Sequence, residues 1–312
     1  MTPAAAESVL RELEPSVERL LERHLAVAHD WLPHQFVPWS GARDFDGPLE
    51  GAAWQPEQSS LPPAVQDSLV INLLTEDNLP SYHFDISVRL GRDGAWGTWN
   101  HRWTAEEDRH SSALRAFIHA RRAVDPVTLE HLRMQHVAAG WTLRWSTVLH
   151  GLAYATVQEL ATRQAHRNTG ALCGDRVGEM LMARIATDEN LHMLFYRGVF
   201  AEALQVFPDD AMTALADVLC GFRMPGAGIP GFQTRAARIA EAGIYNLDVH
   251  REHVVLPLLR ALSVMRATGL GPAGRKAQDR IGLYEKRLET RAARARALYA
   301  PRNPDKALPL SP

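Results

Sequence analysis

Two short motifs in this sequence each place a carboxylate and an imidazole on one face of a helix. Glu107 precedes His110 by three positions, and Glu189 precedes His192 by the same interval. Side chains at that spacing are neighbours on a helix, so each pair can offer one oxygen and one nitrogen to the same metal ion. A single Glu-x-x-His motif is common by chance. The second copy makes a site shared between two helices a specific prediction.

Two further glutamates, Glu76 and Glu159, lie alone in apolar helical stripes. Glu76 shares its face with Leu69 and Leu73, and Glu159 shares its face with Leu152. The two Glu-x-x-His motifs lie in apolar stripes as well, so four helices are expected to bury an acid. A buried carboxylate without a partner is strongly destabilising, and each acid therefore needs a cation or a hydrogen bond.

The order along the chain is Glu, Glu-x-x-His, Glu, Glu-x-x-His. This inventory is typical of ferritin-like four-helix bundles that hold two iron or two manganese ions between carboxylates. Two bridged metal ions would satisfy all four helices at once. The expected cofactor is a carboxylate-bridged pair of iron ions, with manganese or zinc as substitutes. The predicted metal ligands are Glu76, Glu107, His110, Glu159, Glu189 and His192.

The composition suits a soluble globular protein, because 46% of the 312 residues are apolar and 22% are charged. The net charge of −2 gives no reason to expect nucleic acid or an anionic membrane as a partner. The two cysteines, Cys173 and Cys220, are too few for a thiolate cluster, so a metal must be bound through oxygen and nitrogen. The N-terminus does not resemble a signal or transit peptide, and no apolar run is long enough to span a membrane. We therefore expect a cytoplasmic protein.

Helical periodicity without strand alternation predicts an all-α fold. The expected architecture is a ferritin-like four-helix bundle core with additional helices packed around it, in one domain over residues 1–300. The periodicity is lost between Trp31 and Pro63, where we expect a long irregular segment. Residues 301–312 are expected to be extended or disordered. The expected helices cover approximately residues 4–29, 63–90 with a bend at Pro80, 96–123, 126–137, 138–166, 175–207, 209–221, 232–268 with a kink or break at Pro257, and 271–299.

Two acids that directly precede predicted ligands are candidates for supporting roles. Metal-bound histidines normally donate their other ring N–H to an outer carboxylate. Glu106 could hold His192 in this way, and Asp188 could hold His110, each across the bundle. Both acids could equally be solvated charges.

The catalytic candidates are Trp103 and Thr162. Trp103 is expected to pack in the bundle and could also donate a hydrogen bond near the metal. Thr162 follows a predicted ligand by one helical turn and could bring a hydroxyl close to the metal, although a helical threonine needs no such function. His150, His166 and His250 fall outside the pattern and are expected to be structural or exposed.

Several longer segments resemble the soluble acyl-acyl-carrier-protein desaturases, in particular their actinobacterial members. The most specific segments are Trp-Thr-Ala-Glu-Glu-Asp-Arg-His at residues 103–110 and His-Arg-Asn-Thr-Gly at residues 166–170. The resemblance covers most of the chain from about residue 30 to 260. Further similar segments lie at residues 36–39, 74–82, 158–162, 188–192 and 224–226.

The resemblance implies a homodimer with a di-iron cluster in each subunit. It also implies O₂-dependent insertion of a cis double bond into an acyl chain on acyl carrier protein, with electrons from a ferredoxin-type donor. The six ligands named above match the family motif, and Thr162 and Trp103 would surround the cluster. The sequence departs from the motif at Asn190 and Leu191, where a basic pair is usual, and at Met193, where an acid is usual. These departures concern contacts with the electron donor or carrier more than iron binding.

Two alternative functions would use the same residues. A di-iron oxygenase or hydroxylase acting on another substrate would share the ligand set and differ only in its product. A metal-binding homologue without desaturase turnover is the other alternative, suggested by the changes beside His192. A product that has lost two hydrogens, and not gained oxygen, would distinguish a desaturase from an oxygenase.

Overall fold

The computed structural model describes residues 3–145 and 147–299, and within these ranges the chain forms helices and no strand. An isolated bridge joins Phe45 to Ala52 in the long irregular segment. The predicted all-α class is therefore confirmed. The expectation for residues 301–312 lies outside the described residues.

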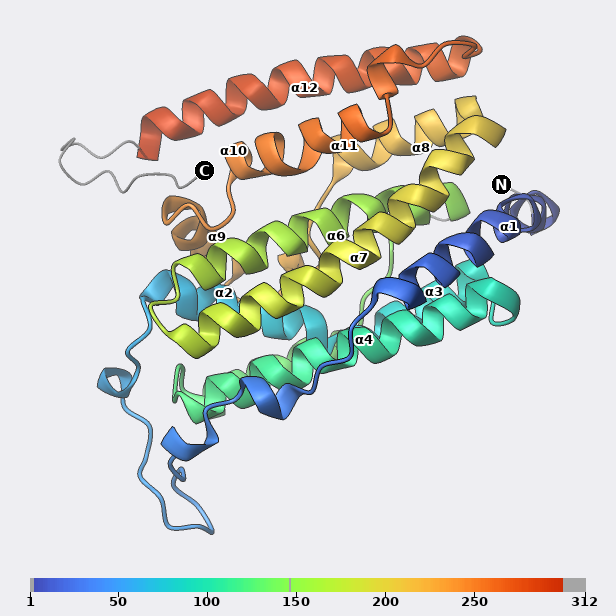
Figure 1. Ribbon diagram of the computed structural model, residues 1–312. Helices are drawn as coiled ribbons and strands as arrows, with labels where there is room; N and C mark the ends of the chain where they lie inside the picture. Colours follow the sequence, from blue (N-terminus) through green and yellow to red (C-terminus); the bar gives the residue numbers. More distant parts are fainter. Residues whose placement is uncertain (1–2, 146, 300–312) are drawn as a thin grey trace.

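Four long helices form the centre of the molecule (Figure 1). They are α2 (Pro63–Asp77), α4 (Gly94–Ala120), α6 (Val148–Ala171) and α7 (Arg176–Val206). The helices α6 and α7 pack against each other along much of their length, and α4 packs against both α2 and α7. Each of the four carries at least one predicted metal ligand.

The remaining helices cover this bundle. Helix α1 packs on α4 and α7, and α3 packs on α4 and α6. Helices α5 and α9 pack on α2. Helix α8 lies between α6 and α12. Figure 1 shows α12 as an outermost layer, parallel to the bundle. The bounds are α1 Pro3–Val27, α3 Leu79–Leu90, α5 Pro126–Ala139, α8 Pro208–Gly221, α9 Phe232–Glu241, α10 Leu247–Val249, α11 Leu256–Ala261 and α12 Pro272–Tyr299.

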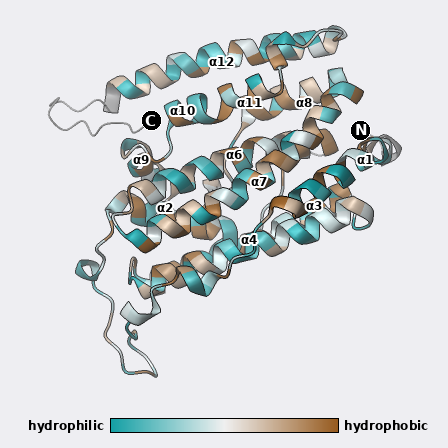
Figure 2. Ribbon diagram, viewed as in Figure 1, coloured by the Kyte–Doolittle hydropathy of each residue, from teal (hydrophilic) through white to brown (hydrophobic). Residues whose placement is uncertain are grey.

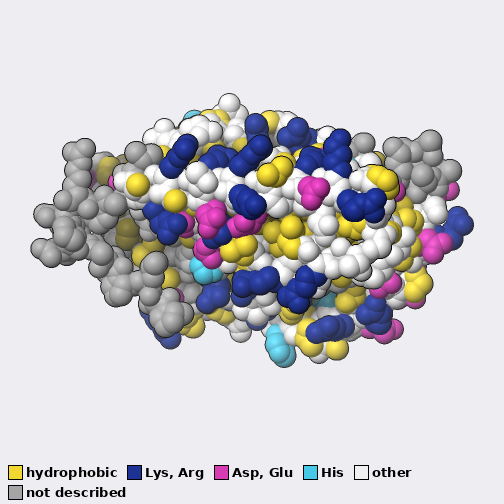
Figure 3. Space-filling view, turned by 90° about the horizontal axis from the view of Figure 1, so that it is seen from above, with side chains coloured by type: hydrophobic (Ala, Val, Ile, Leu, Met, Phe, Trp, Pro, Cys, Tyr) yellow, Lys and Arg dark blue, Asp and Glu magenta, His cyan; other side chains and the backbone are white. Residues whose placement is uncertain are grey.

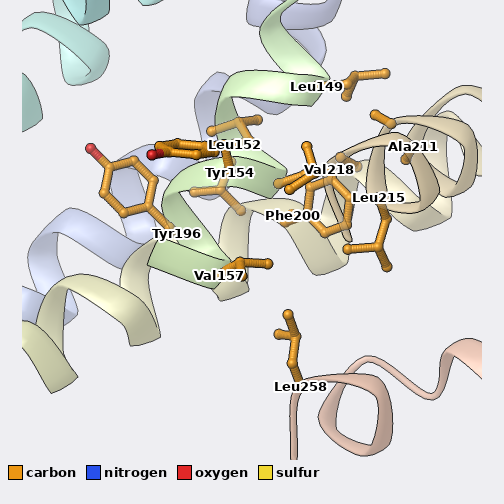
Figure 4. Packing of buried hydrophobic residues seen from close by; sticks show 14 of the residues in the cluster. Leu149, Leu152, Tyr154, Val157, Tyr196, Phe200, Ala211, Leu215, Val218 and Leu258 are labelled. Atoms are coloured by element: carbon orange, nitrogen blue, oxygen red, sulfur yellow. The ribbon is translucent and has the colours of Figure 1, made fainter. Parts of the chain in front are cut away.

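The buried apolar side chains form two clusters. The larger one joins α6 and α7 to α8 and α11, with Leu152, Phe200, Leu215 and Leu258 among its members (Figure 4). The smaller one joins α2 to the C-terminal half of α4 and the N-terminal part of α7. Hydrophobic residues concentrate on the inner helices, whereas α12 is mostly hydrophilic (Figure 2). Along α4 and α7 the predicted ligands lie between the residues of one cluster and the residues of the other.

The segment from 63 to 90 consists of two helices, where a single bent helix was expected. Helix α2 ends at Asp77, Asn78 follows as a helix cap, and α3 begins at Leu79. Pro80 lies in the first turn of α3, where the missing N–H of proline costs nothing. Helix α2 therefore ends one residue after Glu76, and α3 can take another direction.

The predicted helix over residues 138–166 was wrong in its first third. Helix α5 continues to Ala139, and Gly140 then takes a left-handed conformation with φ of +67°. Helix α6 begins only at Val148, where the Thr147 side chain accepts a hydrogen bond from the backbone N–H of His150. A glycine stop and a threonine cap thus enclose a loop that hydrophobic periodicity alone did not reveal.

The predicted helix over residues 232–268 is interrupted earlier than expected. It ends at Glu241, and a short helix then leads into a π-helix from His250 to Val255. Pro257 lies in the first turn of the following helix, α11. The chain therefore stays helical from Leu247 through Pro257 to Ala261, and the break lies before Leu247.

The outer face of α12 is rich in arginine and lysine (Figure 3). Its exposed charged side chains are mostly cationic, with few acids among them. This surface is therefore a solvated face of the outermost layer. None of the helices in the described part of the chain is long and apolar enough to cross a membrane.

Candidate metal centre

The four bundle helices bring the six predicted ligands into one buried site. Every one of the six residues is at most 6% exposed. Their ligand atoms form two groups in which all atoms lie within 4.8 Å of one another. One group contains Glu76, Glu107, His110 and Glu189, and the other contains Glu107, Glu159, Glu189 and His192.

Glu107 and Glu189 belong to both groups. A carboxylate has two oxygens and can therefore contribute one to each of two neighbouring metal ions. The geometry thus describes two adjacent positions, each with its own glutamate and histidine, that share two carboxylates. This donor set of oxygen and imidazole nitrogen suits iron or manganese.

The histidine rings are oriented as metal ligands require. His110 Nδ1 lies 3.1 Å from a Glu107 oxygen, while its Nε2 points outward to Asp188 at 3.4 Å. His192 Nδ1 lies 2.8 Å from the other Glu107 oxygen, and its Nε2 lies 2.9 Å from Glu106. When Nε2–H donates to the outer carboxylate, Nδ1 keeps a lone pair directed into the site.

The carboxylates are too crowded to be ionised together without a cation. Burial raises the pKa of Glu76 to about 8, and the charge of Glu107 adds to this rise. Burial likewise raises the pKa of Glu159 well above its usual value, and Glu189 contributes further. Buried Glu159 Oε2 has no hydrogen-bond partner among the described residues. An unpartnered oxygen among crowded carboxylates is what a pair of metal ions would satisfy, so the residues fit that cofactor.

The catalytic candidates contact two of the glutamates. The indole N–H of Trp103 donates to Glu159 Oε1 at 3.1 Å. The hydroxyl of Thr162 lies 3.1 Å from Glu189 Oε2 and at the same distance from the backbone carbonyl of Glu159. Both side chains therefore help to fix the carboxylates of α6 and α7.

Two residues that the sequence reasoning did not single out hold the outer carboxylates. The indole N–H of Trp31 donates to Asp188 at 2.7 Å, and the imidazole Nε2 of His24 lies 2.9 Å from Glu106. Both side chains are buried. His24 continues the buried stripe of α1 that runs through Leu13, Val17 and Leu20, which was an available signal.

His166 lies at the centre, which corrects the expectation that it stands apart from the ligands. Its ring is buried, and Nε2 is 3.3 Å from Glu76 and 3.4 Å from Glu189. His150 and His250 agree with a structural role. His150 contacts Asp217, and buried His250, at the start of the π-helix, contacts Tyr284 of α12.

An apolar cavity adjoins the centre. Its lining includes Glu76, Glu107 and Glu159 of the candidate centre and the ion pair of Asp85 and Arg89. Most of the other lining residues are apolar or aromatic, with Leu79, Tyr82, Ile86, Trp103, Trp141, Leu152, Tyr154 and Ala155 among them.

A model of the family described as fatty acid desaturase matches residues 5–310. The chain belongs to the fatty acid desaturase family. Over 289 residues this desaturase is 44% identical to the acyl-[acyl-carrier-protein] desaturase DesA1 of Mycobacterium tuberculosis, a match that covers 90% of this chain and 85% of the relative. It is 28% identical over 325 residues to the chloroplastic stearoyl-[acyl-carrier-protein] 9-desaturase of Spinacia oleracea, covering 97% of this chain and 80% of the relative.

A solved structure has the same architecture. The crystal structure of the acyl-ACP desaturase DesA2 from Mycobacterium tuberculosis H37Rv superposes with a TM-score of 0.71 at 28% sequence identity. The match covers 86% of this desaturase and 99% of the DesA2 chain. The ferritin-like helical fold expected from the sequence is therefore confirmed.

The residues at which this desaturase departs from the family motif lie beside the centre on α7. Met193 is buried in the larger apolar cluster, whereas Asn190 is partly buried. Neither side chain belongs to the two donor groups. The departures therefore leave the donor set intact and change the surroundings of His192.

Proposed function

We propose that this desaturase converts a carrier-bound saturated acyl chain into a cis-unsaturated one, using O₂ and two electrons from a ferredoxin-type donor. In the balanced reaction a –CH₂–CH₂– unit, O₂, two electrons and two protons give –CH=CH– and two water molecules. The observation that carries the proposal is that an apolar cavity adjoins two groups of metal-binding atoms that share Glu107 and Glu189.

The proposed ligands divide into three pairs. Glu76 and His110 would hold one iron ion, Glu159 and His192 the other, and the two shared carboxylates would bridge them. Two iron ions held there supply the redox chemistry that an unactivated C–H bond requires, which no amino-acid side chain offers.

The protein's own residues position the substrate and keep the donors in place. The apolar walls of the cavity would bind the acyl chain in an extended form and exclude water, so that one pair of carbons lies beside the centre. Trp103 would fix Glu159 through its indole N–H, and Thr162 would fix Glu189 through its hydroxyl. Glu106 and Asp188 would orient the two histidines.

The names of the relatives support acyl carrier protein as the partner that presents the chain. The electron donor and the homodimer follow from the family resemblance in the sequence, and together with a cytoplasmic location they are part of the proposal.

The test is to load the protein with ferrous iron anaerobically and then add O₂, reduced ferredoxin and a panel of acyl carrier proteins. We expect an acyl product lighter by two hydrogens. Glu159→Ala should abolish it, whereas Glu12→Ala, at an exposed position on α1, should not. A product that has gained oxygen would favour a hydroxylase, and iron binding without any product would favour a homologue without turnover.

A further inference from the structure

A second pocket, separate from the acyl cavity, lies between α6, α7 and the segment of the π-helix and α11. None of its described lining residues is acidic. The floor is apolar and the rim is polar, with Leu160, Met193, Pro257 and Leu258 below and Arg163, Gln164, Arg167, Arg197 and His253 above.

Three guanidinium groups converge on this pocket from two helices. Arg163 and Arg167 lie one turn apart on α6, and Arg197 approaches from α7. In the described part of the chain none of the three forms an ion pair or a side-chain hydrogen bond. Arg89, which is also partly buried, instead donates to Asp85 and to two backbone carbonyls.

The clustering of like charges is electrostatically unfavourable. Burial lowers the pKa of Arg163, and the neighbouring charge of Arg167 lowers it further. Burial also lowers the pKa of Arg197, with a contribution from Arg23 of α1. An anion in the pocket would stabilise each guanidinium. It would compensate for the water removed by burial and would supply the negative charge that no neighbouring carboxylate provides.

Guanidinium groups bind phosphate oxygens through paired N–H donors, and several of them together are typical of phosphate recognition. The imidazole of His253 adds a further donor on the rim. The apolar floor suits a carbon-rich group attached to the phosphate. We propose that this pocket binds a phosphate-bearing small molecule with its phosphate between Arg163, Arg167 and Arg197.

The pocket also lies next to the candidate metal centre along α6 and α7. Leu160 and Met193 of its floor immediately follow the predicted ligands Glu159 and His192. A ligand held by arginines from both α6 and α7 would tie these two helices together. The proposal concerns binding and does not depend on the desaturase reaction.

The test compares the full chain with two variants by calorimetry and thermal unfolding at constant ionic strength. The variants are Arg163→Gln combined with Arg197→Gln, and the control Arg291→Gln on the exposed face of α12. The probes are inorganic phosphate and pyrophosphate, with chloride as the reference anion. We expect saturable pyrophosphate binding to the wild type and the control, weakened about tenfold or more in the double variant.

The double variant also gives a second readout that needs no ligand. Because it removes two charges that neighbouring arginines repel, Arg163 beside Arg167 and Arg197 beside Arg23, it should unfold at a higher temperature than the wild type in low-salt chloride buffer. Equal pyrophosphate responses in all three proteins would overturn the proposal, as would no response in the wild type. Self-association or ferredoxin binding that requires Arg163 and Arg197, without phosphate binding, would also overturn it and assign the pocket to a protein partner.

Discussion

Different side chains support the two outer carboxylates of the candidate centre. Glu106 accepts a hydrogen bond from Arg102 at 2.6 Å on its own helix. Asp188 accepts one from the indole of Trp31 and pairs with Arg184. Because metal-binding histidines depend on such acceptors for their orientation, these outer contacts control how well the donors are pre-organised.

We expect Trp31→Phe to weaken metal binding while leaving the fold intact. Phenylalanine fills most of the same space but cannot donate to Asp188, which then holds His110 less firmly. The loss should be roughly tenfold in metal affinity, measured by competition with a chelator. Trp39→Phe is the matched control because that side chain is 56% exposed. Equal affinities in both variants would show that the Trp31 contact has no such role.

The positions of the six predicted ligands could be expected from the sequence because their signals are local. Spacing of three residues and apolar neighbours on the same helical face are visible in any window of the chain. The Trp31 contact could not be expected, since its partner lies 157 positions away. His166 had a local signal, because it shares a helical stripe with Glu159 and Thr162, but a histidine there is equally compatible with ordinary packing.

At the level of elements, the long irregular segment between α1 and α2 is organised around one arginine. Arg122 is buried just beyond α4 and has a left-handed φ of +47°. Its guanidinium lies 3.9 Å from the centre of the Phe45 ring. It donates to the carbonyls of Arg43, Asp44 and Ala52 and to the side chain of Gln58. These bonds replace the backbone pairing that a helix or sheet would provide.

Arg122→Ala should therefore release this segment without unfolding the bundle. We expect faster amide hydrogen exchange across residues 42–58 and a loss of about 3 kcal/mol in the free energy of unfolding. Arg11→Ala, at an exposed position on α1, should change neither quantity. Unchanged exchange in residues 42–58 of Arg122→Ala would contradict this account.

Element boundaries were predicted less well than element types. The loop between α5 and α6 and the loop between α9 and α10 both interrupt segments that were expected to be helical. A glycine with a left-handed backbone follows the preceding helix in each case, Gly140 after α5 and Gly243 after α9, whereas Pro257 lies within a chain that stays helical. Whether such a residue stops a helix or is absorbed depends on tertiary packing that the sequence pattern does not contain.

For the whole molecule, His250 couples stability to pH. It is buried between Tyr245 and Tyr284, and burial lowers its pKa to about 4. In the unfolded chain a histidine has a pKa of about 6.5. Between these values the unfolded chain takes up a proton that the folded protein does not, so stability falls as pH is lowered from about 6.5 to about 4.

When the pH is lowered from about 7.5 to 5, protonation of this histidine in the unfolded chain should reduce the free energy of unfolding by about 2 kcal/mol. His250→Gln should lose that part of the pH dependence, whereas His34→Gln, at an exposed position, should keep it. Urea unfolding of the metal-free proteins at both pH values measures the difference. An identical pH dependence in His250→Gln and the wild type would exclude this role.

The arrangement of the whole core also accounts for the location of the centre. The two apolar clusters meet at the donors, with Trp103 and Leu114 of α4 on opposite sides of Glu107 and His110. Packing on both sides fixes the backbone of the bundle helices, and the donors are thereby held in place without metal. The donor residues are therefore fixed by the packing of the core, and no loop has to close over them.

The most direct test of this centre is an anaerobic titration with ferrous iron of the wild type and single-site variants. We predict about two iron ions per wild-type chain, about one in Glu76→Ala and in Glu159→Ala, and loss of both in Glu107→Ala because that carboxylate is shared. Circular dichroism should show that each variant keeps its helical content. Two iron ions in folded Glu107→Ala, or none in the wild type, would contradict the assignment of these residues to a two-metal centre.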